Sequence, residues 1–248
     1  MSQISFDNFA QAARRNHLSD TEIAGRYVFQ AEAERLILPD VVAKLAIGPA
    51  DRLLEIGCGP GNLLIPLAYL AATATGIDNE PAIARLRARA PLAENLEGLA
   101  GNFLDLDFGD RRFDKILIYS VLHYLASADE VLRFVDKALA LCAPGGRILL
   151  GDLTNGDRKA RFARSAEGAR VRRQWEAQVA GAGGHAFDSL PADGQLVVIN
   201  DELLLTLVRH CRGLGFEAHL LPQPANLPFG GSREDILIYC HTQPNGSL

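Results

Sequence analysis

Short apolar runs and longer amphipathic segments follow one another along residues 51–153. The apolar runs lie at 51–57, 72–78, 96–106, 112–125 and 147–153. Such runs are typical of strands buried on both faces of a parallel sheet. Between them, the segments 62–72, 79–90 and 128–146 carry apolar residues at helical spacing, and the last is predicted to stop at Pro144-Gly145-Gly146. Strands that alternate with helices predict a doubly wound α/β sheet.

The pattern changes after residue 153. A charged helix and then a glycine-rich loop are predicted within 154–202, followed by a helix at 201–215. Two strands, at 216–222 and 233–242, have no helical pattern between them, so the last strand is predicted to be antiparallel.

These elements predict an α/β fold with a mostly parallel, seven-stranded sheet, helices on both faces and an antiparallel last strand. The segment 21–38 is predicted to be helical. We therefore expect an N-terminal helical cap over residues 1–38 and a main domain over 39–248. Within that domain, 154–202 is expected to be an insertion after strand five that selects the substrate.

The sequence LLEIGCGPGN at 53–62 places three glycines directly after the first strand. Glycines there allow a tight turn and a close approach of a ligand to the backbone. Their spacing at Gly57, Gly59 and Gly61 differs from the G-x-G-x-x-G pattern of dinucleotide-binding folds. Glu55 would face the ligand from the strand end, and a carboxylate there suits a cation better than a pyrophosphate.

A second acid, Asp78, ends the second predicted strand. An acid at this position can accept hydrogen bonds from both ribose hydroxyls. An adenosine that carries a cationic amino-acid tail would suit both Asp78 and Glu55. The simpler alternatives are a surface acid for Glu55 and a helix N-cap for Asp78.

Five segments in order now resemble the class I S-adenosylmethionine (SAM)-dependent methyltransferases, of the type that acts on small molecules. The segments read LLEIGCGPGN, TGIDNEPAIARLRAR, GNFLDLDF, FDKILIYSVLHYL and APGGRILLGD. The resemblance covers about residues 40–153 and, more weakly, 201–242. It implies a Rossmann-like fold, SAM as the methyl donor and S-adenosylhomocysteine as the product.

The resemblance also implies roles for individual residues. The implied cofactor-binding residues are Glu55, Gly57, Cys58, Gly59, Gly61, Asp78, Asn79, Asn102, Phe103, Tyr119 and Ser120. Asp78 would bind the ribose, while Tyr119 and Ser120 would lie beside the methionine portion. Asn102 would contact the adenine amino group, or it is a plain turn residue. Phe103 would lie against the adenine, or it belongs to the core.

Substrate contacts are expected from the cap, from the end of the fourth strand and from the insertion. The expected residues are Tyr27, His123, Arg173 and Trp175. His123 is the candidate general base, with packing or a helix start as the alternative. Trp175 is expected either in a core or in a substrate platform.

An arginine-rich stretch within 154–202 has two interpretations. It contains Arg158, Arg161, Arg164, Arg170, Arg172 and Arg173. The simpler interpretation is a solvated helix face, and the other is a pocket for an anionic substrate.

Charge and composition argue against several classes of partner and ligand. The formal net charge of −5 argues against nucleic acid as a partner, and the absence of an apolar stretch of about 18 residues argues against a membrane span. No apolar signal region is visible near the N-terminus, so a cytoplasmic location is expected. The four cysteines are far apart, which favours reduced, mostly buried thiols. No metal is expected, and the pattern makes no prediction of oligomeric state.

The chemistry predicted is methyl transfer to an O or N atom of a small molecule. The chain reads YSVLH after the fourth strand, which lacks the N-P-P-Y or D-P-P-Y motif of enzymes that methylate amino groups of bases or glutamine. One alternative is a SAM-binding regulator or partner subunit without turnover. The other is a nicotinamide-dependent oxidoreductase, which the glycine spacing and Glu55 disfavour.

Overall fold

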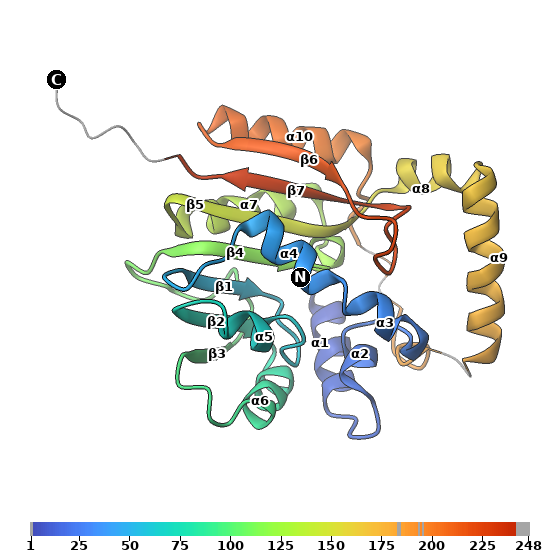
Figure 1. Ribbon diagram of the computed structural model, residues 1–248, viewed down its shortest axis with the longest axis horizontal. Helices are drawn as coiled ribbons and strands as arrows, with labels where there is room; N and C mark the ends of the chain where they lie inside the picture. The colour runs from blue at the N-terminus through green and yellow to red at the C-terminus, as the bar shows by residue number, and fades with distance from the viewer. Residues whose placement is uncertain (1, 183–184, 193, 195, 242–248) are drawn as a thin grey trace.

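A seven-stranded sheet forms the centre of the molecule in the computed structural model, which describes residues 2–182, 185–192, 194 and 196–241 (Figure 1). The strands are β1 Arg52–Ile56, β2 Thr73–Asp78, β3 Leu96–Ala100, β4 Phe113–Tyr119, β5 Cys142–Thr154, β6 Glu217–Pro222 and β7 Arg233–Tyr239. Their order is β3-β2-β1-β4-β5-β7-β6, and β7 runs antiparallel to both of its neighbours. The predicted fold class is confirmed.

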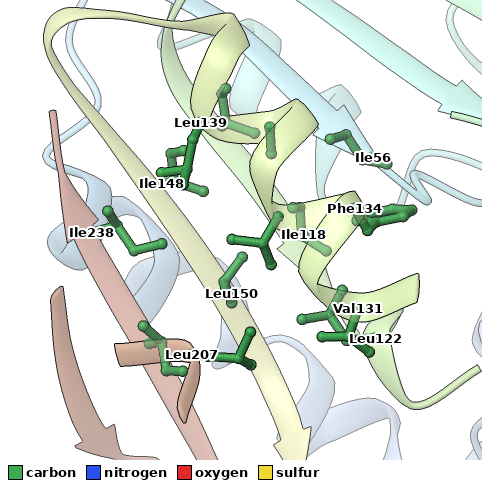
Figure 2. Packing of buried hydrophobic residues seen from close by; sticks show 14 of the residues in the cluster. Ile56, Ile118, Leu122, Val131, Phe134, Leu139, Ile148, Leu150, Leu207 and Ile238 are labelled. Atoms are coloured by element: carbon green, nitrogen blue, oxygen red, sulfur yellow. The ribbon is translucent and has the colours of Figure 1, made fainter. Parts of the chain in front are cut away.

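Helices cover both faces of the sheet because successive strand residues point to opposite sides. Ile56, Ile118 and Ile148 pack under α7 (Ala128–Leu141) and α10 (Asp201–Gly213), as Figure 2 shows for this cluster. Leu53 and Leu117 face the other side. They pack with residues of α4 (Ile37–Leu45), α5 (Leu64–Ala68) and α6 (Glu80–Arg89). The parallel strands β1, β2, β4 and β5 are therefore buried on both faces, as their continuous apolar runs predict, whereas the edge strand β3 is only partly buried.

The N-terminal cap is a series of short helices. It comprises α1 Gln3–Ala13, α2 Asp20–Ile23, the 3-10 helix η1 Val28–Gln30 and α3 Ala31–Glu34. The segment 21–38, predicted to be helical, forms several short helices and not a continuous one, because the chain turns at Gly25, whose φ is 75°. Asp20 holds the cap on the main domain: its carboxylate lies 3.1 Å from Arg89 Nε, and its carbonyl accepts a hydrogen bond from Asn62.

The charged helix after β5 is divided in two. α8 spans Gly156–Ala163 and α9 spans Ala166–Gly181, and the Ser165 hydroxyl caps α9 by accepting the Gly168 N–H at 2.9 Å. α9 stands outside the sheet, beside the cap (Figure 1). Residues 183–184, 193 and 195 of the predicted loop lie outside the described residues, as does 242 of the last predicted strand.

Two expectations for the segment between α7 and β5 are wrong. The helix ends at Leu141, and Pro144-Gly145-Gly146 lies inside β5. The Gly145 N–H donates to the Cys240 carbonyl at 2.7 Å, so this segment pairs with another part of the chain and does not form a free loop.

Cys142 and Cys240 form a disulfide, which corrects the expectation of four reduced thiols. Cys58 and Cys211 are free and buried.

Candidate functional site

A narrow cavity of about 80 Å³ lies where β1, β2 and β4 end. Its lining from the cap is Phe9, Ile23, Ala24, Arg26 and Glu34, with Ile37 of α4. Its lining from the sheet and loops is Glu55, Gly57, Cys58, Gly59, Pro60, Asn62, Leu63, Asp78, Tyr119, Ser120, Val121 and Tyr124. Ligand pockets usually offer about 300–1,000 Å³, so the cap closes this one tightly.

The glycine loop has the backbone that only glycine adopts readily. Gly57 has a φ of 79°, and a Cβ there would lie 2.3 Å from Cγ2 of Val121. Gly59 has a φ of 53°, yet a Cβ there would meet nothing within 4 Å. Gly57 therefore lets the loop pack against Val121, two residues past the end of β4, whereas Gly59 presents open backbone to the cavity.

Asp78 organises this loop from the end of β2. Its Oδ2 accepts the Gly59 N–H at 2.8 Å, and its Oδ1 accepts the backbone and side-chain N–H of Asn79 at 2.7 Å. Burial raises the pKa of Asp78, although these backbone hydrogen bonds oppose the rise. The N-cap of α6 is Asn79, whose Oδ1 accepts the Ala82 N–H, so capping is not the role of Asp78.

Glu55 points into the same cavity from β1. It is only 3% exposed, and its buried Oε2 has no hydrogen-bond partner within the described chain. Burial, and secondarily the charge of Asp78, raise the pKa of Glu55 well above its ordinary value. An unpartnered buried carboxyl beside a second acid is a site for a cationic or hydrogen-donating ligand.

The ends of β4 and β5 meet through two strained residues. Ser120 and Asp152 have φ values of 60° and 57°, a region that non-glycine residues seldom adopt. The Ser120 hydroxyl donates a short hydrogen bond to the Asp152 carboxylate. Tyr119, next to Ser120, is 5% exposed, and its hydroxyl accepts a hydrogen bond from Gln223 Nε2. Paired strain of this kind is concentrated at functional sites.

Arg26 of the cap reaches the same place, and the sequence patterns did not single it out. Its Nη2 donates to Ser120 Oγ at 3.2 Å and lies 3.8 Å from Asp152 Oδ2. Its Nη1 lies 3.6 Å from Glu34 Oε1, while its buried Nε has no hydrogen-bond partner among the described residues. Within the described chain, Arg26 is the basic residue of the cavity lining.

His123 lies in the 3-10 helix η2 (Leu122–Tyr124), just past β4. Its ring packs against that of Tyr124, which lines the cavity, but His123 itself is not part of the lining. Burial, and then the positive charge of Arg233, lower the pKa of His123 to about 3. The imidazole is therefore neutral at physiological pH, and its buried Nδ1 has no partner within the described residues.

Several of the predicted cofactor residues take other places or are shielded, and Gly61 and the N-cap residue Asn79 lie outside the cavity lining. Asn102 Oδ1 accepts the Leu104 N–H at 3.2 Å, in a local turn outside the cavity lining. Phe103 is 3% exposed and packs on Phe134 at 4.7 Å, in the core under α7. Cys58 lines the cavity, but burial raises the pKa of its thiol well above the ordinary value.

A second, open cleft of about 440 Å³ lies between the cap and α9. Tyr27 lines it, and the Trp175 ring contacts Tyr27 at a centroid distance of 5.5 Å. Arg173 is exposed on α9 and lines neither cavity. Most of the arginine-rich stretch pairs with acids, as in Arg161 with Asp201, which favours a solvated face.

Two properties of the described chain bear on other ligands. Among the described residues, no group of three or more His, Cys, Asp or Glu side chains could hold a metal ion. None of the helices that the structure describes is long and apolar enough to cross a membrane.

Comparison with known proteins is consistent with this geometry. Residues 54–150 match the family described as "Methyltransferase domain". An uncharacterized methyltransferase of Synechocystis is 34% identical over 110 residues, which cover 44% of this chain and 50% of the relative. Nodulation protein S of Rhizobium tropici is 31% identical over 112 residues, which cover 45% of this chain and 47% of that protein. The chain thus spans about half the length, or less, of the curated relatives that match first.

Solved structures match over nearly the whole chain. Phosphoethanolamine N-methyltransferase 1 of Haemonchus contortus has a TM-score of 0.72 at 15% identity, covering 98% of this chain and 50% of that one. The N-methyltransferase NodS of Bradyrhizobium japonicum, solved with S-adenosylhomocysteine, has a TM-score of 0.61 at 17% identity, covering 97% and 100%. The described chain has the fold of the class I SAM-dependent methyltransferases.

Proposed function

We propose that this protein is a SAM-dependent methyltransferase that methylates an O or N atom of a small molecule. The observation that carries the proposal is the pair of carboxyl groups beside the glycine loop in one cavity, that of Glu55 buried and that of Asp78 half-buried. A pyrophosphate would raise the pKa values of both acids further, whereas an adenosine with a cationic tail would favour their ionised forms and pair with them.

The residues present fit the chemical groups of SAM. Asp78 would accept hydrogen bonds from the ribose hydroxyls, and Glu55, whose Oε2 lacks a partner, would face the ammonium group. Gly59 leaves open space beside the backbone for the methionine portion. Arg26 would hold the carboxylate of SAM, because it supplies the positive charge of the cavity lining.

When bound, SAM supplies an electrophilic methyl group on its sulfonium. The chain's contribution is to position the acceptor atom in line with that methyl and to exclude water. The cap closes the cavity, so Phe9 and Arg26 would exclude water from above the strand ends. Ser120 lines the cavity there and donates its hydroxyl proton to the buried Asp152 carboxylate, so the Ser120 oxygen would accept a hydrogen bond from the acceptor's O–H or N–H.

His123 is proposed to position the acceptor and not to remove its proton. A general base works best when its pKa lies near the working pH, and the pKa of His123 is about 3. Its neutral ring can still accept or donate a hydrogen bond beside Tyr124.

The test is calorimetric titration with SAM, S-adenosylhomocysteine and NADH in parallel. We expect binding of the first two and not of NADH. Transfer of radiolabel from methyl-labelled SAM to members of a small-molecule panel then tests turnover. A well-folded protein that binds neither SAM nor S-adenosylhomocysteine would contradict the proposal.

A further inference from the structure

The open cleft between the cap and α9 has two unlike walls. One wall carries the rings of Tyr27 and Phe29, which are stacked at 5.0 Å with an interplanar angle of 15°. The other wall is a part of α9 with very small side chains, namely Ala177 and Gly181, followed by Ala182. A slot between flat rings and a small-residue helix face accommodates a flat body better than a branched one.

Arg26 connects this cleft to the cavity at the strand ends. It lines both, and its Nη2 contacts Ser120 while its buried Nε has no hydrogen-bond partner within the described chain. Arg26 is 6% exposed, so its guanidinium is buried among the residues that line the two spaces. Among the described residues, only Arg26 therefore reaches both spaces, contacting Ser120 at the end of β4 and lining the cleft.

The cleft also has polar groups at its border. Glu22, Gln178 and His185 line it. The Nδ1 of His185 accepts the Phe187 N–H at 3.3 Å, so in the neutral ring the other nitrogen carries the proton and is a donor. The His185 ring meets Tyr27 edge to face at 4.6 Å. An apolar slot with a few convergent polar groups is the usual form of a small-molecule site.

We infer that this cleft binds the methyl acceptor, and that the acceptor is a planar aromatic compound bearing a hydroxyl or amino group. The inference rests on the proposed methyl transfer. The aromatic body would lie between Tyr27 and Phe29 on one side and α9 on the other. Its hydroxyl or amino group would point past Arg26 toward Ser120 and Asp152.

The chain offers its own reporter for this site. Trp175 is its single tryptophan, and its ring lies 5.5 Å from Tyr27 and 5.2 Å from Phe29. A ring that enters the cleft changes the surroundings of that cluster, so occupancy should change Trp175 fluorescence. The probes are phenol, catechol, aniline, 4-hydroxybenzoate and 4-aminobenzoate, with cyclohexanol, cyclohexylamine and trans-4-hydroxycyclohexanecarboxylate as saturated counterparts.

The titration uses the full protein saturated with S-adenosylhomocysteine. We expect at least one aromatic probe to shift Trp175 emission saturably and to bind at least tenfold more tightly than its saturated counterpart. Equal binding of aromatic and saturated probes, or no binding of any aromatic probe, would overturn the inference. Failure of S-adenosylhomocysteine itself to bind would instead overturn the proposed function.

Two variants on one helix locate the site. Ala177→Leu places a larger side chain in the cleft, whereas Ala180→Leu makes the same change at an exposed position of α9 that lines neither cavity. We expect Ala177→Leu to weaken the best aromatic probe at least tenfold in calorimetry and Ala180→Leu to leave its affinity within twofold. Both should bind S-adenosylhomocysteine normally, and equal probe affinity in the two variants would place the acceptor elsewhere.

Discussion

At the scale of single residues, the site is defined by buried charges that the fold leaves incompletely matched. Glu55 and Asp78 share a cavity with Arg26, and Arg26 also contacts Glu34 and Asp152. A buried charge without a complete set of partners lowers stability and persists where a ligand completes the set. We therefore make separate predictions for Glu55 and for Arg26.

Glu55 should make the protein less stable as the pH rises. The folded protein raises the pKa of Glu55 and Asp78, so between their ordinary values, near 4, and the raised values it binds more protons than the unfolded chain. The free energy of unfolding then falls with increasing pH across this window. Glu55→Gln removes part of that fall. Between pH 5 and pH 8, the unfolding free energy of the variant should rise relative to that of the parent by about 1 kcal/mol or more.

Urea unfolding of Glu55→Gln and of the parent, each measured at pH 5 and at pH 8, checks this expectation. Calorimetry of the same variant should show SAM affinity at least tenfold lower, because the ammonium favours the ionised form of Glu55 on binding and a glutamine cannot supply that carboxylate. Parallel pH dependences in the two proteins would mean that Glu55 is not held neutral by burial.

Arg26→Met should separate ligands by their carboxylate. Loss of a charged hydrogen bond costs about 1.5–3 kcal/mol, which is a loss of roughly tenfold to a hundredfold in affinity. S-adenosylhomocysteine should lose this much, whereas 5′-methylthioadenosine, which lacks the amino-acid portion, should bind the variant and the parent alike. An equal loss for both ligands would assign Arg26 to the shape of the cap and not to the carboxylate.

Some of these residues were predictable and others were not. Glu55 and Asp78 occupy positions at strand ends, and strand periodicity alone places such positions at one edge of the sheet. Arg26 meets Ser120 across 94 positions of sequence, and no local pattern marks such a contact. Phe103 sits where the family resemblance implies an adenine contact, but its apolar ring packs into the core beside Phe134.

At the scale of the elements, the first strand, its glycine loop and the turn after β4 form one joint. Gly57 packs against Val121, and Ser120 immediately before it has a strained backbone. Periodicity predicts the strands themselves well because they are buried on both faces. It fails at their ends, as where β4 stops at Tyr119 and a 3-10 turn follows inside a continuous apolar run.

Comparing two glycine substitutions tests whether the contact between the glycine loop and Val121 contributes to stability. Gly57→Ala forces both an unfavourable φ and a Cβ contact of 2.3 Å with Val121, so we expect a loss of about 3 kcal/mol or more in unfolding free energy. Gly59→Ala meets no neighbouring atom within 4 Å and should cost only about 1–2 kcal/mol, from its backbone conformation. Urea denaturation distinguishes them, and equal costs would mean that the loop repacks freely around Val121.

At the scale of the whole molecule, one covalent link joins distant parts of the chain. The Cys142–Cys240 disulfide connects the start of β5 to the residue after β7, across 98 positions. The spacing of cysteines in the sequence does not reveal this pairing, because only the sheet order brings these two strands together. The same applies to the cap, whose place over the strand ends follows from tertiary contacts and not from its helical pattern.

Reduction of this disulfide should lower stability measurably. A link that closes a loop of this length stabilises by about 2–5 kcal/mol, and dithiothreitol should remove that amount in urea unfolding. The double variant Cys142→Ser, Cys240→Ser should match the reduced protein and ignore dithiothreitol. Thiol titration of the unreduced, denatured parent should find two free thiols, those of Cys58 and Cys211. Four would contradict the link.

The tight closure of the cavity at the strand ends has a consequence for the time course of cofactor capture. With about 80 Å³ of free space, SAM can enter only molecules whose cap has moved away from the glycine loop. The observed association rate should then level off at high SAM concentration, at the opening rate of the cap. Affinity measured after brief mixing would be underestimated, and Asn62→Ala, which frees the loop from Asp20 and Glu34, should raise the plateau.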